Sequence, residues 1–382
     1  MTDSIYEKVA DAVNQRTGYP CFKCPELFAI LEFLYTPEEA ELAVKMPMMP
    51  MPADALAQNI GEPPEKIRAM LEGMADKALV FTDDSGDIRK YVLVPLLPGT
   101  FEVHFMRGGT DAKTMELAQL FKNYFDVVDR VRAKKAAASV RSRAYTSVPF
   151  SRVISIEEEI PSGVLIHPYD RVSKYIEESE LVSIGACYCR HFGELTGNPC
   201  TKPKDNCFSL GPQAKFMIER GFNRAVTKEE ALRVLAEAEE AGLVHCSSNT
   251  SESINFICNC CSCHCGIMES IRASDSPNAA AESSFIMRLD EDACIGCGDC
   301  VERCQVEAIT LEGDRVVHNT GRCIGCGLCI STCPSGALTL VPREGAKEPP
   351  KTLADLTVAM IVSFQEQRQQ RQLEKEKAAG KK

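Results

Sequence analysis

The sequence predicts an α+β protein with several domains, and three observations support this prediction. The chain has 382 residues, enough for two or three domains of ordinary size. Helix-spaced apolar residues alternate along it with short apolar segments bounded by turn residues, which is typical of strands and hairpins. Most of the 20 cysteines fall into two groups, between 187 and 265 and between 294 and 333. We expect an irregular cysteine-rich middle domain and a C-terminal domain with a repeated cysteine pattern.

Cysteine is the feature of the composition that needs an explanation. A hydrophobic fraction of 45% is ordinary for a globular protein, whereas 20 cysteines with no tryptophan are not. The N-terminus lacks the basic and apolar regions of a signal peptide, so we expect a cytoplasmic protein, in which clustered cysteines bind metal rather than form disulfides. No apolar segment reaches the roughly 20 residues of a membrane helix. The net charge of −11 disfavours nucleic acid as a partner.

The first domain, residues 1–110, combines helices with a hairpin. Helices are predicted over 54–61 and from 63 onward, followed by a strand, a tight turn and a strand between 79 and 94. This order resembles a winged-helix domain over about residues 25–105. The resemblance implies a second helix that reads DNA, but that helix carries equal numbers of basic and acidic residues. We therefore expect a structural or partner-docking module.

Residues 111–150 are predicted to connect the first domain to the middle one. An amphipathic helix is expected over 114–132, and it continues into the most basic segment of the chain, 130–143. We interpret this segment as a solvated helix surface or as a docking strip for an acidic partner.

The middle domain, residues 151–275, contains ten cysteines, more than one metal site needs. Nine are predicted metal ligands: Cys187, Cys189, Cys200, Cys207, Cys258, Cys260, Cys261, Cys263 and Cys265. Thiolates select zinc and iron–sulfur clusters, and this spacing fits the paired knuckles of zinc ribbons poorly. We expect at least one further cluster, 4Fe-4S in preference to zinc, with ligands divided between 187–207 and 258–265.

Other residues near these ligands have more than one interpretation. Cys246 is interpreted as a buried thiol, and so are Cys21 and Cys24, a pair with no second pair nearby. His264 fits a metal ligand and a solvent-facing spacer equally well. Arg190, beside a predicted ligand, is expected to lower the pKa of a thiolate and to offset cluster charge. A substrate-facing or redox-active thiol is an alternative use of the surplus cysteines.

The C-terminal domain, residues 284–345, contains one cysteine spacing twice. Each copy reads C-x2-C-x2-C-x3-C, the bacterial run for 4Fe-4S clusters. The stretch of about 284–342 resembles the two-cluster bacterial ferredoxin domain. The resemblance implies one 4Fe-4S cluster on Cys294, Cys297, Cys300 and Cys333, and a second on Cys323, Cys326, Cys329 and Cys304. Gln305 departs from the family, which has proline there, and we expect an altered turn after Cys304. Residues 346–382 are predicted to form a docking helix with a disordered polar tail.

These patterns favour an iron–sulfur electron-transfer protein of anaerobic metabolism, which relays single electrons to or from a partner oxidoreductase. We expect no catalytic residue, because no base, nucleophile or nucleotide-binding loop accompanies the cysteines. Whether the chain is an enzyme stays open, with an electron carrier or an iron–sulfur subunit of an oxidoreductase preferred. The alternatives are a redox-sensing winged-helix transcription regulator and an iron–sulfur enzyme with its active site in the middle cysteines.

Overall fold

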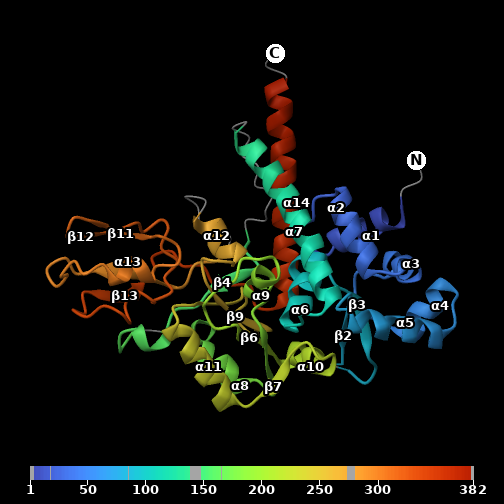
Figure 1. The fold of residues 1–382 in the computed structure, drawn as a ribbon, viewed down its shortest axis with the longest axis horizontal. Helices are drawn as coiled ribbons and strands as arrows, with labels where there is room; N and C mark the ends of the chain where they lie inside the picture. Colours follow the sequence, from blue (N-terminus) through green and yellow to red (C-terminus); the bar gives the residue numbers. More distant parts are fainter. Residues whose placement is uncertain are drawn as a thin grey trace.

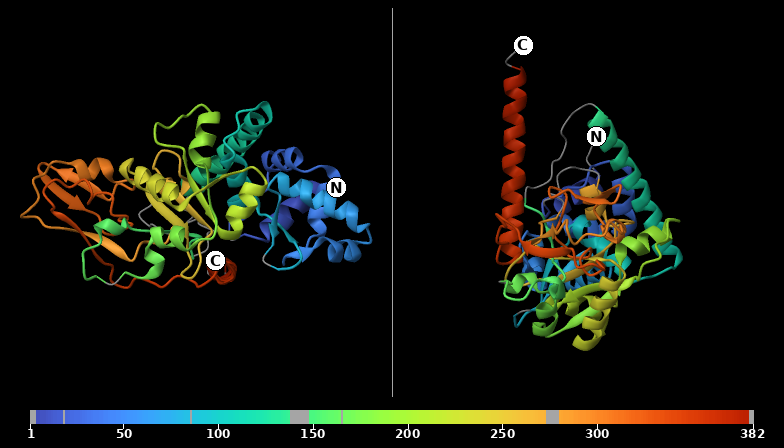
Figure 2. Two further views of the ribbon diagram at one scale, coloured as in Figure 1. Left: turned by 90° about the horizontal axis from the view of Figure 1, so that it is seen from below. Right: turned by 90° about the vertical axis from the view of Figure 1, so that its left-hand side faces the viewer.

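The structure is a computed structural model, and it describes residues 4–17, 19–84, 86–137, 148–164, 166–272 and 280–379. Helices and strands are mixed, in agreement with the predicted α+β class. Figure 1 and the left view of Figure 2 show the N-terminal helices, a central sheet and the C-terminal cysteine loops in a row. Residues 138–147, which include the end of the basic segment 130–143, lie outside the described residues, as do 273–279 before the C-terminal domain and the last three residues.

The N-terminal part is mostly helical, with a small antiparallel sheet in the order β1-β3-β2. Its elements are α1 (Ile5–Asn14), α2 (Pro25–Leu34), α3 (Pro37–Lys45), β1 (Met51–Pro52), α4 (Ala53–Ile60), α5 (Pro64–Asp76), β2 (Val80–Asp83), β3 (Lys90–Leu93), α6 (Phe101–Met106) and α7 (Ala112–Ala137). Gly61 ends α4 at φ 75°, a left-handed conformation that favours glycine. Pro63 and Pro64 begin α5, because proline fits the first turn of a helix. The predicted helices and hairpin of this region are present.

Cys21 and Cys24 are buried in the N-terminal core beside α2. Burial raises the pKa of Cys21 to about 12, so this thiol stays neutral. Their environment agrees with the interpretation as buried thiols.

Six of the described strands form an antiparallel sheet in the middle of the molecule. In sheet order they are β4 (Ser151–Val153), β8 (Val244–Ser248), β9 (Phe256–Cys260), β6 (Asp205–Leu210), β5 (Val182–Ala186) and β7 (Arg224–Val226). The helices of this part are α8 (Val172–Glu178), α9 (Tyr188–Leu195), α10 (Gly211–Glu219), α11 (Lys228–Glu240) and α12 (Gly266–Arg272). The prediction of an irregular middle domain was wrong. Strands such as β8 are buried on both faces although they contain serine and histidine, so they lack the alternation that identifies a half-buried strand.

The C-terminal module consists of two antiparallel strand pairs and the cysteine loops. β10 (Phe285–Leu289) pairs with β13 (Leu338–Pro342), and β11 (Ile309–Glu312) pairs with β12 (Arg315–His318). α13 (Asp299–Arg303) follows the first cysteine loop. The predicted strands of this module are present.

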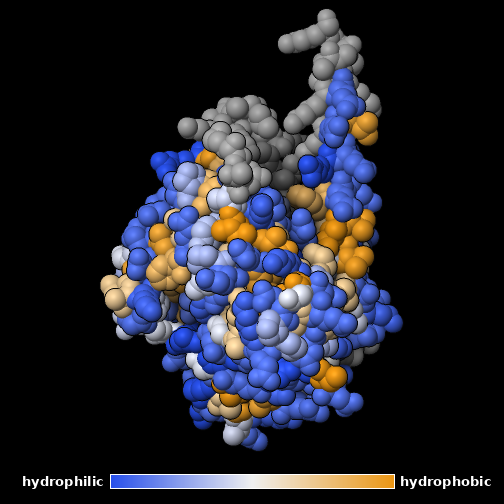
Figure 3. Space-filling model, turned by 90° about the vertical axis from the view of Figure 1, so that its right-hand side faces the viewer, coloured by the Kyte–Doolittle hydropathy of each residue, from blue (hydrophilic) through white to orange (hydrophobic). Residues whose placement is uncertain are grey.

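Helix α14 (Leu353–Ala379) projects from the body (Figures 1 and 2). The polar segment predicted as a disordered tail is helical up to Ala379, since glutamine, glutamate, lysine and arginine all favour helix. Leu356 and Met360 of α14 are buried, whereas Val358 and Val362 are exposed. Figure 3 shows hydrophobic side chains on the part of this helix next to the body and mostly hydrophilic ones further out.

Candidate iron–sulfur and metal centres

Four cysteines from both runs of the C-terminal module line one hollow: Cys294, Cys297, Cys300 and Cys333. The first three come from the loop before α13 and from its first turn, and Cys333 comes from the second run. Burial raises the pKa of Cys300, and negative charge on Cys297, Cys294 and Cys333 raises it further. The structure thus gathers the four residues that the resemblance assigned to one cluster.

The remaining four cysteines of this module lie on its more buried side. Burial raises the pKa of Cys326 to about 12, and charge on Cys304 and Cys323 raises it further. Negative charge on Cys304 also raises the pKa of Cys329. Cys304, the fourth cysteine of the first run, therefore lies near the second run. The Cys304 sulfur accepts a hydrogen bond from the Ala308 backbone N–H at 3.2 Å. Metal binding at the neutral thiols of Cys326 and Cys329 must release protons.

Two glycines let the cysteine loops pack closely against neighbouring backbone. Gly296 and Gly325 have φ values of 67° and 71°. A Cβ atom on Gly325 would lie 1.9 Å from the Phe285 carbonyl oxygen, and one on Gly296 would lie 2.3 Å from that of Asp314. Any other residue would displace these loops and the cysteines they carry.

A second, largely buried pocket lies in the middle part. Its cysteines are Cys187, Cys189, Cys207, Cys258, Cys260, Cys261 and Cys265. They come from the start of α9, from β6, from the end of β9 and from the turn before α12, so the fold joins the two sequence groups. Seven thiols and one guanidinium among its lining residues make a donor set that fits an inorganic cluster better than an organic substrate.

The sulfur atoms of this pocket interact directly. Hydrogen bonds from the thiols of Cys189 and Cys207 hold the pKa of Cys187 well below its ordinary value. The same bonds raise the pKa values of the two donors. Cys258 is hydrogen-bonded to Cys207 and Cys260, so the contacts continue from β6 to β9. The thiols therefore form one connected group.

Arg190 places a positive charge in the wall of this pocket, with 1% of its surface exposed. Its guanidinium donates to the Asn259 carbonyl oxygen at 3.0 Å, to Asn206 Oδ1 at 2.6 Å and to the Cys261 sulfur at 3.7 Å. No ion pair in the described part of the chain joins Arg190 to a carboxylate. A buried cation needs a negative partner, and Cys187, whose pKa is lowered, is the thiol of this pocket that supplies one. Arg190 also lowers the pKa of Cys187, though less than the hydrogen bonds do.

The other predicted ligands lie at a second position. Cys200 and Cys263 group with Cys261 and His264, so Cys261 borders both sites. Cys246 is fully buried and hydrogen-bonds to Cys260 without lining the pocket, in agreement with its interpretation as a buried thiol. The sequence left His264 open between a metal ligand and a solvent-facing spacer, and the structure places it next to these cysteines.

The middle pocket and the C-terminal module share one hydrophobic core. Cys260 and Cys265 of the pocket pack in the same cluster as Cys300, Cys323 and Cys329. The two parts are therefore continuous in packing.

Hydrogen bonds reinforce this junction. The Ile156 N–H donates to the Cys326 carbonyl oxygen at 3.0 Å. The Ser262 backbone N–H donates to Gln305 Oε1 at 2.9 Å. Gln305, which replaces the proline of the ferredoxin family, thus contacts the turn between Cys261 and Cys263. The sequence marked this position as a departure, but only the fold identifies its partner.

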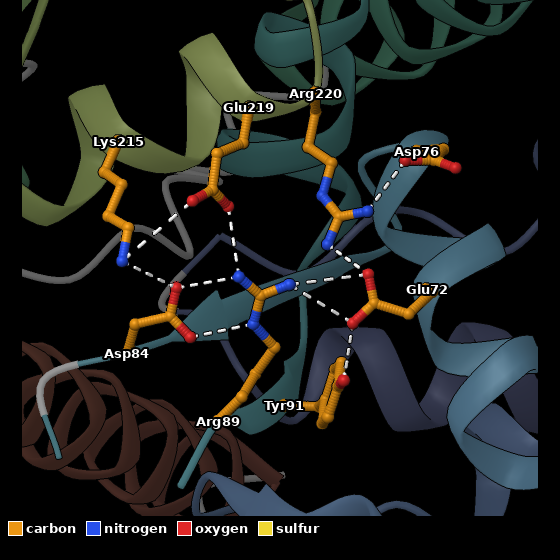
Figure 4. Close-up of polar contacts among 8 residues, drawn as sticks. All are labelled: Glu72, Asp76, Asp84, Arg89, Tyr91, Lys215, Glu219 and Arg220. Carbon is orange, nitrogen blue, oxygen red and sulfur yellow. Dashed lines mark hydrogen bonds and ion pairs between the residues drawn. The ribbon is translucent and has the colours of Figure 1, made fainter. Parts of the chain in front are cut away.

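A charged network joins the N-terminal part to the middle part (Figure 4). Arg89, beside β3, binds Asp84 at 2.8 Å and Glu72 of α5 at 3.3 Å, and it reaches Glu219 of α10 at 3.1 Å. Arg220, which follows α10, binds Glu72 at 2.5 Å. The hairpin and the second half of α5 are therefore held against α10.

The first half of α5 carries basic residues that are already paired. Lys66 binds Glu62 at 2.8 Å, and Arg68 binds Asp54 at 2.5 Å. This exposed part of the helix therefore offers no surplus of positive charge.

The family model described as a 4Fe-4S dicluster domain matches residues 287–340. No curated protein and no solved structure matches the chain. The family match confirms the iron–sulfur module expected from the cysteine spacing and supports a role in electron transfer. None of the helices in the described part of the chain has both the length and the apolar character needed to cross a membrane.

Proposed function

We propose that this protein relays single electrons, through two 4Fe-4S clusters and a further cysteine-bound cluster, to or from a partner oxidoreductase. The observation that carries the proposal is the core that contains thiols of both the middle pocket and the C-terminal module. Thiolate-bound iron–sulfur clusters supply one-electron redox chemistry. Because electron transfer slows steeply with distance, closely packed sites suit a relay.

The cysteines divide among three sites in this proposal. The C-terminal ligand sets are those that the resemblance implies: Cys294, Cys297, Cys300 and Cys333 for one cluster, and Cys323, Cys326, Cys329 and Cys304 for the other. Thiols of the middle pocket hold the further cluster, and Arg190 offsets its negative charge. The buried Arg190 guanidinium in the pocket wall, which donates to the Cys261 sulfur, supports an anionic occupant.

The exposed end of the C-terminal module is the proposed contact for the partner. Cys297 is exposed, and Ile295 beside it exposes 66% of its surface. An apolar side chain next to a cluster ligand suits the small interface of a transient redox complex. Cys323 and Cys329 face the core instead and are each 8% exposed.

The winged-helix-like N-terminal part is proposed to dock within the chain rather than to read DNA. A DNA-reading helix needs free basic surface. In α5, Glu72 and Asp76 bind Arg220, and the two basic residues Lys66 and Arg68 are paired. This arrangement disfavours the regulator.

A reducing compartment, such as the cytoplasm of an anaerobic cell, is also part of the proposal. None of the 20 cysteines forms a disulfide, and Cys263 and Cys297 are exposed. Exposed thiols at metal sites are oxidised readily outside a reducing environment.

Iron and acid-labile sulfide analysis of anaerobically purified protein tests the third cluster. We expect about 12 iron atoms per chain, against about 8 for the C-terminal clusters alone. Cys207→Ala, which removes a thiol from the middle pocket, should reduce the count to about 8. Cys21→Ala, which removes a buried thiol of the N-terminal core, is the matched control and should keep the wild-type count. A wild-type count near 8 would refute the third cluster.

Electron paramagnetic resonance of the reduced protein tests the relay. Neighbouring paramagnetic clusters broaden and split each other's signals. We expect wild-type protein to show an interaction that disappears in Cys207→Ala while the C-terminal signals persist. A wild-type spectrum equal to the sum of isolated clusters would contradict the shared-core relay.

A further inference from the structure

A compact group of metal-binding side chains lies beside the middle pocket. The sulfur atoms of Cys200, Cys261 and Cys263 and a ring nitrogen of His264 all lie within 4.8 Å of one another. Cys200 comes from the loop between α9 and β6, and the other three come from the turn between β9 and α12. Two segments about 60 residues apart in sequence therefore meet at this point.

The hydrogen bonds of His264 point independently to a ligand. The Nε2 atom lies 2.6 Å from the Asn198 carbonyl oxygen, which can only accept, so Nε2 carries the proton. The Nδ1 atom is then an unprotonated acceptor, and it is buried without a hydrogen-bond partner in the described part of the chain. Metal-bound histidines usually have this arrangement, in which one nitrogen donates to a carbonyl and the other binds the ion.

The packing around the His264 ring is also specific. A Cβ atom on Gly193 of α9 would lie 2.2 Å from His264 Cδ2 and 2.4 Å from Nε2. The His264 ring can occupy this position only because Gly193 has no side chain. The Asn198 carbonyl, in the same stretch of chain, fixes its orientation.

The separation of the ligand atoms fits a single ion. Bonds of about 2.3 Å to a tetrahedral zinc ion place sulfur ligands about 3.8 Å apart. The four ligand atoms lie within 4.8 Å of one another, close to that spacing. Three thiolates and one imidazole are a common ligand set of structural zinc sites.

We propose that Cys200, Cys261, Cys263 and His264 bind one structural zinc ion, distinct from the cluster of the middle pocket. All four positions of the ion are filled by the protein, so the site is closed to substrate. It ties the turn after β9 to the loop before β6. Because Cys260 and Cys265 flank this turn and line the pocket, the zinc ion holds one wall of the pocket in place. The site does not depend on whether a cluster occupies that pocket.

Metal analysis and zinc K-edge X-ray absorption of the full-length, anaerobically purified protein test the proposal. We expect about one zinc ion per chain, with about three sulfur neighbours and one nitrogen neighbour. Absorption at the zinc edge is not affected by iron. Cys263→Ser should remove zinc while leaving the iron count unchanged. His264→Cys should keep zinc and convert its neighbours to four sulfurs, which a purely structural role for His264 would not produce.

Two variants separate this proposal from the proposed cluster. Cys207→Ala should remove iron and keep zinc, the reverse of Cys263→Ser. Cys246→Ser, at a buried thiol outside the four ligands, is the control and should keep both metals. Less than about 0.2 zinc per chain, or a wild-type zinc with four sulfur neighbours, would overturn the zinc site. Loss of iron rather than zinc in Cys263→Ser would also overturn it, because the residue would then be a cluster ligand.

Discussion

The contact between Gln305 and Ser262 gives the sharpest prediction about the junction between the two cysteine regions. Gln305 is 8% exposed, and its Oε1 atom accepts the Ser262 N–H at 2.9 Å. Gln305→Leu keeps the approximate size of the side chain and removes the acceptor. A buried N–H without a partner costs about 1–3 kcal/mol. This free energy corresponds to an increase of about 5- to 150-fold in local opening of the turn.

Hydrogen exchange of peptides covering residues 258–266 measures this opening in the holoprotein. We expect faster exchange in Gln305→Leu and near-normal exchange in Gln305→Glu, because a carboxylate still accepts the bond. Gln305→Pro, which restores the residue of the ferredoxin family, should exchange as fast as the leucine variant. Gln119→Leu, at an exposed glutamine on α7, is a control for unrelated effects. Equal exchange in wild type and Gln305→Leu, or fast exchange in Gln305→Glu, would refute the reasoning.

Three further predictions concern docking, redox potential and pH. Arg220→Ala should weaken the contact between the N-terminal part and α10 by about 1–2 kcal/mol. The effect is moderate because Arg220 is mostly buried but Asp76, one of its two partners, is exposed. The rate of proteolysis in the 82–89 turn measures this change, and an unchanged rate would contradict the prediction. Ser335→Ala removes a hydroxyl that lies 3.7 Å from the Cys333 sulfur. Loss of this hydrogen bond, about 0.5–1 kcal/mol, should lower the reduction potential of the nearby cluster by about 20–40 mV. A redox titration followed by paramagnetic resonance should show an unchanged potential for the second C-terminal cluster. Burial raises the pKa of Glu102 to about 7, although the Gly99 N–H donates a hydrogen bond to its carboxylate. The folded state therefore holds this proton more tightly than the unfolded state does. The free energy of unfolding should fall by up to about 3 kcal/mol as pH rises from 4.5 to above 7. Denaturant unfolding of Glu102→Gln should lack this decrease, and equal pH profiles for variant and wild type would exclude Glu102 as its source.

The sequence predicted the C-terminal module well because its information is local. Both cysteine runs are short, and Gly296 and Gly325 occupy positions where the backbone allows no side chain. The helices and hairpin near 54–94 were predicted for the same reason, since prolines and Gly61 mark their ends. Local patterns were less informative in the middle part, where buried strands contain polar residues.

The grouping of the middle cysteines was decided by tertiary structure. From the sequence alone, the nine predicted ligands could not be divided between separate sites. The pairing of Phe208 with Ile257 places Cys207 of β6 next to Cys258 of β9, and the turn after Cys260 directs Cys263 to a different site. Contacts between segments about 50 residues apart depend on strand pairing, which no local spacing specifies. The sequence by itself thus predicted an iron–sulfur module from its repeated cysteines, and the family match supports it. Only the fold, by pairing distant strands, placed Arg190, His264 and Gln305 beside the remaining thiols.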